Sequence, residues 1–117
     1  MKRFVIVGIG NFGSGVAEAL YRRGHDVIAI DVNEDAVDRI APHASRPAVG
    51  DARQTEVLKQ AGAADADTAI VSTGDDMTAS MLAVLALKDL GVDDIYVKEL
   101  SGDHARIMTA LGVSETI

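Results

Sequence analysis

Apolar residues in this chain gather into short uninterrupted runs, separated by longer stretches in which they recur every three or four positions. The first run is Phe4–Val7, and three more follow at Val27–Ile30, Thr68–Ser72 and Ile95–Val97. Uninterrupted hydrophobicity of this length is typical of strands that are covered on both faces, as in a parallel sheet. We therefore predict these four runs as central strands.

Two weaker segments complete the set of predicted strands. Arg46–Val49 is short and contains Pro47, which has no amide hydrogen to donate to a neighbouring strand, so we place it near a sheet edge. Glu115–Ile117 looks like the beginning of a sixth strand.

The stretches between these runs have the spacing and the end signals of helices. The side chains of Asn33 and Ser101 are suited to capping helix N-termini, and Gly24 and Gly91 are suited to ending helices in a left-handed conformation. The stretch from about 75 to 90 is apolar on nearly every side, so we expect a helix that is largely buried.

Strands and helices alternate along the whole chain, with short connections and no internal repeat. This alternation predicts an α/β fold, a Rossmann-type doubly wound parallel sheet with the strand order 3-2-1-4-5-6. We expect a single domain over residues 1–117, without a linker.

Composition narrows the function classes. The chain is 48% hydrophobic and 25% charged, which indicates a soluble globular domain. Its formal net charge of −7 argues against a nucleic-acid partner, because phosphate backbones are bound by basic surfaces. The lack of cysteine excludes disulfides, thiolate catalysis and cysteine metal ligands, and fits a cytoplasmic setting. No apolar stretch approaches the roughly 20 residues that span a bilayer, so we expect no direct membrane insertion.

Candidate chemistry begins where the first strand ends, at Gly8, Gly10 and Gly13. Glycines at this spacing between a strand and a helix are typical of dinucleotide-binding turns. The first allows a tight turn, the second lets a pyrophosphate approach the backbone, and the third lets helix and strand pack closely. Free amides and the helix dipole at the start of the helix would attract negative charge. Taken alone, the pattern also fits an ordinary glycine-rich turn.

Asp31 ends the second predicted strand, at the distance from the glycines where an acidic residue accepts hydrogen bonds from a ribose. Together with the glycine spacing and the strand–turn–helix context, this carboxylate predicts a nucleotide site. It also disfavours NADP, because a 2′-phosphate about 4 Å away would be repelled by roughly 4 kcal/mol at an effective dielectric constant near 20. Val32 and Asn33 come next, so no arginine follows to offset the repulsion.

The ends of the later strands carry further candidates. Asp51 and Ala52 follow the third strand, where a carboxylate can accept a hydrogen bond from an adenine amino group, although a helix-capping aspartate explains Asp51 equally well. Thr73 and Gly74 follow the fourth strand beside the crevice where such folds bind ligands, with a plain turn as the alternative. Lys98 could reach a phosphate from the fifth strand, although a lone lysine there is more often solvated.

No catalytic or metal-binding constellation is evident. His25, His43 and His104 are scattered along the chain, and His104 alone lies near the predicted ligand side. We expect structural or solvated roles for these histidines. We therefore predict no catalytic residue and no metal ligand.

The sequence resembles, across its whole length, the N-terminal (TrkA-N) domain of the RCK (KTN) family, the regulators of potassium conductance. The features that carry the resemblance are Val7–Gly13, Asp31–Asn33, Val49–Ala52, the small-residue helix Ala79–Ala83, Ile95–Lys98 and the closing Leu111–Ile117. Each piece is generic to Rossmann domains, whereas their ordered set is fairly specific. The chain is most similar to the cytosolic gating subunits of Ktr and Trk potassium transporters.

This resemblance implies a non-enzymatic sensor that binds NAD(H), ATP or ADP. It also implies a homodimer that assembles into a ring and gates an integral-membrane potassium-translocating subunit from the cytoplasmic side. The nucleotide contacts that it implies, with those of the glycine turn, are Gly8, Gly10, Asn11, Phe12, Gly13, Asp31, Val32, Asn33, Asp51, Ala52, Thr73, Gly74, Lys98 and His104. Many relatives carry arginine where Asn11 stands, which leaves the choice between ATP and NAD(H) or ADP open. The C-terminal RCK domain is absent from these residues.

Two alternatives remain open beside a nucleotide-sensing regulatory subunit. One is the cofactor-binding domain of an NAD-dependent oxidoreductase, although 117 residues leave no room for a separate substrate domain. The other is an adenine-nucleotide-binding structural domain of some other assembly.

Overall fold

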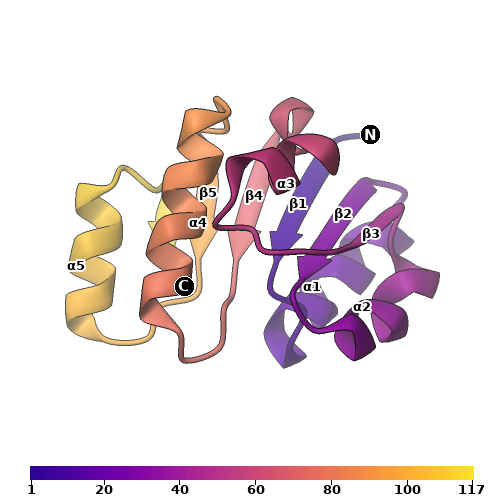
Figure 1. Ribbon diagram of the computed structural model, residues 1–117, viewed down its shortest axis with the longest axis horizontal. Helices are drawn as coiled ribbons and strands as arrows, with labels where there is room; N and C mark the ends of the chain where they lie inside the picture. The colour runs from indigo at the N-terminus through magenta and orange to yellow at the C-terminus, as the bar shows by residue number, and fades with distance from the viewer.

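Six parallel strands form one sheet with helices on both faces in the computed structural model, which describes residues 1–117 (Figure 1). The strand order is β3-β2-β1-β4-β5-β6, so the predicted doubly wound Rossmann-type fold is confirmed. The elements in chain order are β1 (Arg3–Val7), α1 (Asn11–Arg22), β2 (Asp26–Asp31), α2 (Glu34–Ile40), η1 (Ala41–His43), β3 (Arg46–Val49), α3 (Thr55–Gln60), η2 (Ala63–Asp65), β4 (Thr68–Val71), α4 (Met77–Asp89), β5 (Ile95–Val97), α5 (Gly102–Ala110) and β6 (Glu115–Thr116).

The strand order reverses at the central strand β1. It pairs in parallel with β2 on one side and with β4 on the other. Strands β2 and β3 are added on one side of β1. The chain then crosses back, and β4, β5 and β6 are added on the other side. In folds of this kind the reversal leaves a crevice at the carboxyl ends of the two central strands.

Alternate residues of the central strands supply two apolar cores. Val5 and Val7 face a core that includes Leu58 of α3 and Leu87 of α4. Ile6 faces the opposite core, which is completed by residues of α1 and α2. In Figure 1, α3 and α4 lie on the near face of the sheet and α1 lies on the far face. Burial on both faces explains why these strands are continuously apolar in sequence.

The predicted end signals are largely confirmed. Asn33 Oδ1 accepts a hydrogen bond from the Ala36 amide at 3.2 Å, and Ser101 Oγ accepts one from the His104 amide at 3.1 Å, so both cap their helices. β3, which carries Pro47, is an edge strand, as predicted, and β6 is the other edge.

The helix α4 is less buried than its composition predicts. One side contacts the sheet, whereas Leu82 and Leu85 on the other side are 39% and 44% exposed. The expectation of a largely buried helix was wrong for that side, because a helix lying on one face of a sheet can bury only one of its own faces against it. α4 starts at Met77, after its N-cap Asp76. No helix in the fold combines the length and the apolar character that crossing a lipid bilayer requires.

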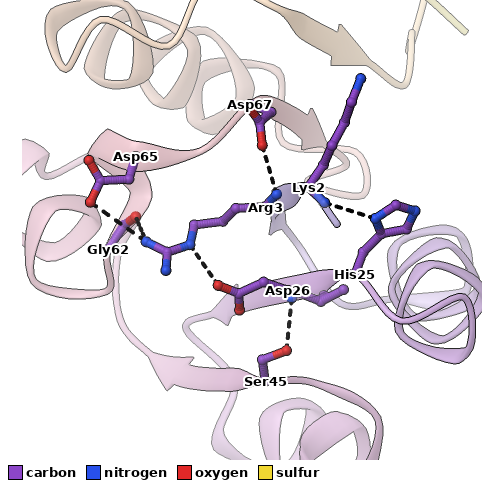
Figure 2. Close-up of polar contacts among 9 residues, drawn as sticks. Lys2, Arg3, His25, Asp26, Ser45, Gly62, Asp65 and Asp67 are labelled. Atoms are coloured by element: carbon purple, nitrogen blue, oxygen red, sulfur yellow. Dashed lines mark hydrogen bonds and ion pairs between the residues drawn. The ribbon is translucent and has the colours of Figure 1, made fainter.

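Polar side chains at the amino ends of the strands bond to one another around Arg3 (Figure 2). Its Nε donates to Asp26 Oδ2 at 2.7 Å, its Nη1 donates to the Gly62 carbonyl at 3.4 Å, and Nη1 lies 3.7 Å from Asp65 Oδ2. Its backbone amide donates to Asp67 Oδ2 at 2.8 Å. One arginine therefore connects β1, β2 and the chain that leads from α3 to β4.

A second polar cluster also lies at the amino ends of the strands, beside β5. Asp94 accepts hydrogen bonds from Thr68 Oγ1 at 2.8 Å and from Ser114 Oγ at 2.7 Å. The hydrogen bonds from Ser114 and Thr68 hold the pKa of the Asp94 carboxyl below its usual range. These contacts join the amino ends of β4, β5 and β6.

Candidate functional site

A cavity of about 320 Å³ opens at the carboxyl ends of the strands. The residues that line it are Val7, Gly8, Gly10, Ile30, Asp31, Val32, Gly50, Asp51, Ala52, Arg53, Ser72, Thr73, Gly74, Asp76, Ala79 and Ala83. The structure thus brings together, from four strand ends, these sequence-predicted site residues: Gly8, Gly10, Asp31, Val32, Asp51, Ala52, Thr73 and Gly74.

The three glycines of the first turn differ in their surroundings. Gly8 has φ +90°, and a Cβ there would lie 1.7 Å from the Ser72 carbonyl oxygen. A Cβ on Gly13 would lie 1.8 Å from the Gly8 carbonyl oxygen, so α1 approaches the turn too closely for any side chain. A Cβ on Gly10 would meet nothing within 4 Å. Gly8 and Gly13 are thus required by the fold, whereas Gly10 leaves open space in which a ligand could approach the backbone.

Asp31 is held against this turn. Its Oδ2 accepts a hydrogen bond from the Ile9 amide at 2.7 Å, and its Oδ1 accepts one from the Asn33 amide at 2.9 Å. A carboxylate offers about four acceptor positions, so each oxygen can accept one more donor. Asp31 therefore lines the cavity in a fixed orientation with capacity left for a ligand hydroxyl.

Asp51 is bonded differently, because Arg53 occupies its carboxylate. Arg53 donates from its backbone amide and its Nε to Oδ1, both at 3.0 Å, and from Nη2 to Oδ2 at 2.8 Å. The side-chain hydrogen bond from Arg53, reinforced by its amide, lowers the pKa of Asp51 below its usual value. The same pairing raises the pKa of the Arg53 guanidinium, with a smaller contribution from Asp76.

The first residues of α4 form the wall on the β4 side. Asp76 Oδ1 accepts a hydrogen bond from the Ala79 amide at 2.9 Å and so caps the helix. Thr73 Oγ1 donates to the Asp76 carbonyl at 2.8 Å, which fixes the turn between β4 and α4. Gly74 in that turn has φ +63°, a left-handed conformation that favours glycine.

Several predicted contacts do not line the cavity. Gly13 is buried under the turn, and Asn33 uses its side chain to cap α2. Asn11 and Phe12 open α1 beside the turn, and the Lys98 ammonium lies 5.9 Å from the centre of the Phe12 ring. This is within the range of a cation–π contact, so Lys98 is held near the start of α1.

His104 is wholly buried and is not part of the cavity wall. Its Nδ1 accepts a hydrogen bond from the Leu100 amide at 3.1 Å, and its Nε2 lies 2.7 Å from Ser80 Oγ. Because an amide can only donate, the ring proton is on Nε2 and is donated to Ser80. Ser80 Oγ in turn donates to the Met77 carbonyl at 2.8 Å. Burial lowers the pKa of His104, and both ring nitrogens are occupied within the protein.

Half of the residues that line the cavity are not predicted from the sequence, among them Arg53, Asp76 and the two alanines of α4. The sequence offers no arginine directly after Asp31, whereas Arg53 reaches the same cavity from the end of β3. The signal that could have found it is its position two residues after Asp51, where a side chain can fold back onto the carboxylate. No group of three or more acidic or histidine side chains is arranged to hold a metal ion.

Residues 4–117 match the family model of the TrkA-N domain. Ktr system potassium uptake protein C of Bacillus subtilis (strain 168) is 36% identical over 116 residues, which cover 99% of this chain and 52% of that protein. Ktr system potassium uptake protein A of the same organism is 32% identical over 116 residues, with 99% and 52% coverage. The chain thus spans about half the length of these curated relatives.

Solved structures share the fold. The TrkA-N domain of the inner membrane protein ybaL from Escherichia coli superposes with a TM-score of 0.88 at 20% identity, covering 99% of this chain and 86% of that one. The Kef C-terminal domain of Shewanella denitrificans in its AMP-bound form gives 0.76 at 24% identity, with 98% and 70% coverage. The GsuK channel bound to NAD gives 0.83 at 18% identity, with 99% and 21% coverage. The match of the family model over nearly the whole chain confirms the resemblance found in the sequence, and the chain belongs to the TrkA-N (RCK N-terminal) domain family.

Proposed function

We propose that this chain is the nucleotide-binding regulatory unit of a potassium uptake system, in which NAD(H), ATP or ADP binds in the cavity at the carboxyl edge of the sheet. The observation that carries the proposal is the combination of an open glycine turn and an oriented Asp31 in one cavity. A ribose hydroxyl would donate to Asp31, while phosphates would lie over Gly10 and the first amides of α1.

The choice among nucleotides depends on charge near the start of α1. Asn11 is neutral, so Lys98 is the cation held beside the phosphate position. The cavity itself is lined by the carboxylates of Asp31, Asp51 and Asp76 and by one guanidinium, which already pairs with Asp51. This arrangement supports nucleotides of low phosphate charge over ATP, and it continues to disfavour the 2′-phosphate of NADP.

The regulatory role is supported by the relatives, which are named as potassium uptake proteins. Residues 1–117 would serve as the RCK N-terminal unit of such a protein. We include in the proposal a homodimer assembled into a ring at the cytoplasmic face of an integral-membrane potassium-translocating subunit. Nucleotide exchange would act by making different contacts in two states of the assembly, since only differential binding shifts a conformational equilibrium.

We propose no catalytic role for the chain. The buried Ser80–His104 pair has both histidine nitrogens occupied and no access from the cavity, so it does not offer a nucleophile and base to a substrate. A nucleotide bound at this site would therefore act as a signal, with the protein releasing it unchanged.

Titration calorimetry of the chain with NADH, NAD, ATP, ADP and NADPH tests the proposal. We expect at least one of the first four to bind with a dissociation constant below about 1 mM, and NADPH to bind more weakly than NADH. Asp31→Ala should cost roughly 1.5–3 kcal/mol of binding free energy, since it removes a charged hydrogen-bond acceptor. Asp38→Ala on the exposed face of α2 is the matched control and should leave affinity unchanged. The proposal fails if none of the nucleotides binds in this range.

A further inference from the structure

The buried ring of His104 joins two segments that flank the nucleotide cavity. Its Nδ1 accepts a hydrogen bond from the Leu100 amide at 3.1 Å, and its Nε2–H donates to Ser80 Oγ at 2.7 Å. Leu100 follows Lys98 in the connection between β5 and α5, and Ser80 follows Ala79, which lines the cavity. One side chain therefore connects the segment that carries Lys98 to the wall formed by α4.

Ser80 extends this connection to the first residue of α4. Its hydroxyl donates to the Met77 carbonyl at 2.8 Å while it accepts the hydrogen bond from the His104 ring. Met77 directly follows the N-cap residue Asp76, which also lines the cavity. The ring, the hydroxyl and the carbonyl thus form a continuous series of hydrogen bonds that ends at the cavity wall.

This series of hydrogen bonds requires a neutral ring. A protonated imidazole carries a hydrogen on both nitrogens, so its Nδ1 would direct a donor at the Leu100 amide, which is itself a donor. The ring is wholly buried, and this burial lowers the pKa of His104. Protonation in acid therefore breaks the contact with Leu100 and places a charge in the interior of the fold.

The charge that acts on the ring is the carboxylate of Glu99, which favours the protonated form more weakly than burial opposes it. From α4 the ring meets the uncharged Ser80 hydroxyl. Other charged side chains on the elements around the ring are exposed or bonded elsewhere, namely Asp76, Lys88, Lys98, Asp103, Arg106 and Glu115. No carboxylate is thus bonded to the ring to hold a proton on Nδ1.

We propose that His104 is a positioning residue of the nucleotide site, and that its neutral ring holds the first turn of α4 and the Lys98 segment in the geometry that binds nucleotide. This inference rests on the proposed function. Acid then weakens binding, because the protonated ring cannot hold both segments. Affinity is fully present where the ring is neutral and is lost as the pH falls through the pKa of His104 in the folded chain. By linkage, bound nucleotide in turn disfavours protonation of the ring.

Calorimetric titration with NAD at pH 7.5 and at pH 5 tests the inference. The pyrophosphate of NAD keeps the same charge over this interval, so a change in affinity reports on the protein. For the unmodified chain we expect the affinity to fall by about threefold or more at pH 5, the effect of losing one hydrogen bond. If NAD does not bind, ADP replaces it, and the ratio of variant to unmodified affinity at each pH cancels the ionisation of its phosphate.

Two variants separate the two hydrogen bonds of the ring. His104→Asn keeps an acceptor near the Leu100 amide but does not reach Ser80, whereas His104→Gln reaches Ser80 and leaves the amide without an acceptor. Both should bind about threefold more weakly at pH 7.5, and neither should lose further affinity at pH 5, because neither side chain titrates. Ser80→Ala, which keeps the ring and cuts its connection to α4, should also weaken binding about threefold at pH 7.5.

His25→Asn is the matched control, because the Nδ1 of His25 likewise accepts from a backbone amide, that of Lys2 at 3.1 Å, at the amino ends of the strands. It should keep the affinity and the pH profile of the unmodified chain, and circular dichroism confirms that the compared proteins are folded. The inference is overturned if the unmodified affinity is equal at the two pH values, if His104→Asn keeps the pH dependence, or if Ser80→Ala binds normally. Those results leave the proposed function standing, whereas a failure of NAD(H), ADP and ATP alike to bind overturns both.

Discussion

The polar groups at the amino ends of the strands and those at the carboxyl ends are used in opposite ways. At the amino ends of the strands, Arg3 bonds to Asp26 and to the segment before β4 (Figure 2). Asp94 accepts hydrogen bonds there from Thr68 at the start of β4 and from Ser114, which precedes β6. At the carboxyl edge, the Asp31 carboxylate is oriented by backbone amides and faces a cavity. The amino edge is thus internally satisfied, whereas the carboxyl edge retains capacity for a ligand.

We therefore expect the amino ends of the strands to contribute to the stability of the fold and the carboxyl ends to contribute to nucleotide binding. Substitutions at the amino edge should change the free energy of unfolding and leave nucleotide affinity unaltered. Substitutions at the carboxyl edge should do the reverse, except where the backbone itself is crowded.

The largest effect is expected at Gly8, where the separation should fail. Gly8→Ala places a Cβ within 1.7 Å of the Ser72 carbonyl oxygen at φ +90°, so it should lower the free energy of unfolding by about 3 kcal/mol or more. Gly10→Ala meets no atom within 4 Å and should change stability by less than about 1 kcal/mol while weakening nucleotide binding. Urea denaturation and calorimetry measure both; equal stabilities for the two variants would contradict the geometry.

Arg3→Ala tests the amino edge. The side chains of Arg3 and Asp26 are 22% and 11% exposed, and removing the arginine leaves a mostly buried carboxylate without its partner. We expect a loss of about 2 kcal/mol in the free energy of unfolding, with unchanged nucleotide affinity. The exposed pair Arg106–Asp103 provides the control, since Arg106→Ala should cost under about 0.5 kcal/mol. A matching loss of affinity in Arg3→Ala would show that the two edges are coupled.

A smaller, pH-dependent effect is expected from His104. Its pKa is lower in the folded chain than in the unfolded chain, so folding favours the neutral ring. The stabilisation is fully present above the unfolded pKa near 6.5 and is lost as the pH falls toward the folded pKa. The melting temperature should therefore fall from pH 7.5 to pH 5, and His104→Asn should flatten this dependence in that interval. An unchanged slope in the variant would assign the pH dependence to other groups.

The smallest effect concerns Lys98 and Phe12, which join β5 to α1 beside the cavity. An exposed cation–π contact contributes about 0.5 kcal/mol. A double-mutant cycle of Phe12→Leu and Lys98→Ala, followed by thermal denaturation, should give a coupling energy of that size. Strictly additive single variants would show that the two side chains are neighbours without a stabilising contact.

The fold could be predicted closely because its determinants are local or periodic. Continuous apolar runs identified strands buried on both faces, and Asn33 and Ser101 identified helix starts through short-range hydrogen bonds. The burial of α4 could not be predicted in the same way. Its apolar residues continue around the helix, so the sequence carries no signal for which side, the one with Leu82 and Leu85, stays exposed.

The site was predicted only in part, for a similar reason. Gly10 and Asp31 follow a fixed spacing, and the structure brings both to the cavity. Arg53 lies on another connection, and its place depends on how a flexible side chain folds back onto Asp51. His104 follows the ligand-side strand in sequence, but its ring turns inward to Ser80, which spacing does not encode. Whether each predicted contact touches a nucleotide stays a prediction.

The pairing of β1 has a consequence for how the chain folds. Phe4 pairs with Val27, a near neighbour in sequence, and also with Thr68, which lies more than half the chain away. Closing the second contact orders a much longer loop, and non-local pairings of this kind slow folding. We therefore expect the half that contains β1, β2 and β3 to assemble first, and the docking of β4 onto the open side of β1 to be the slower step.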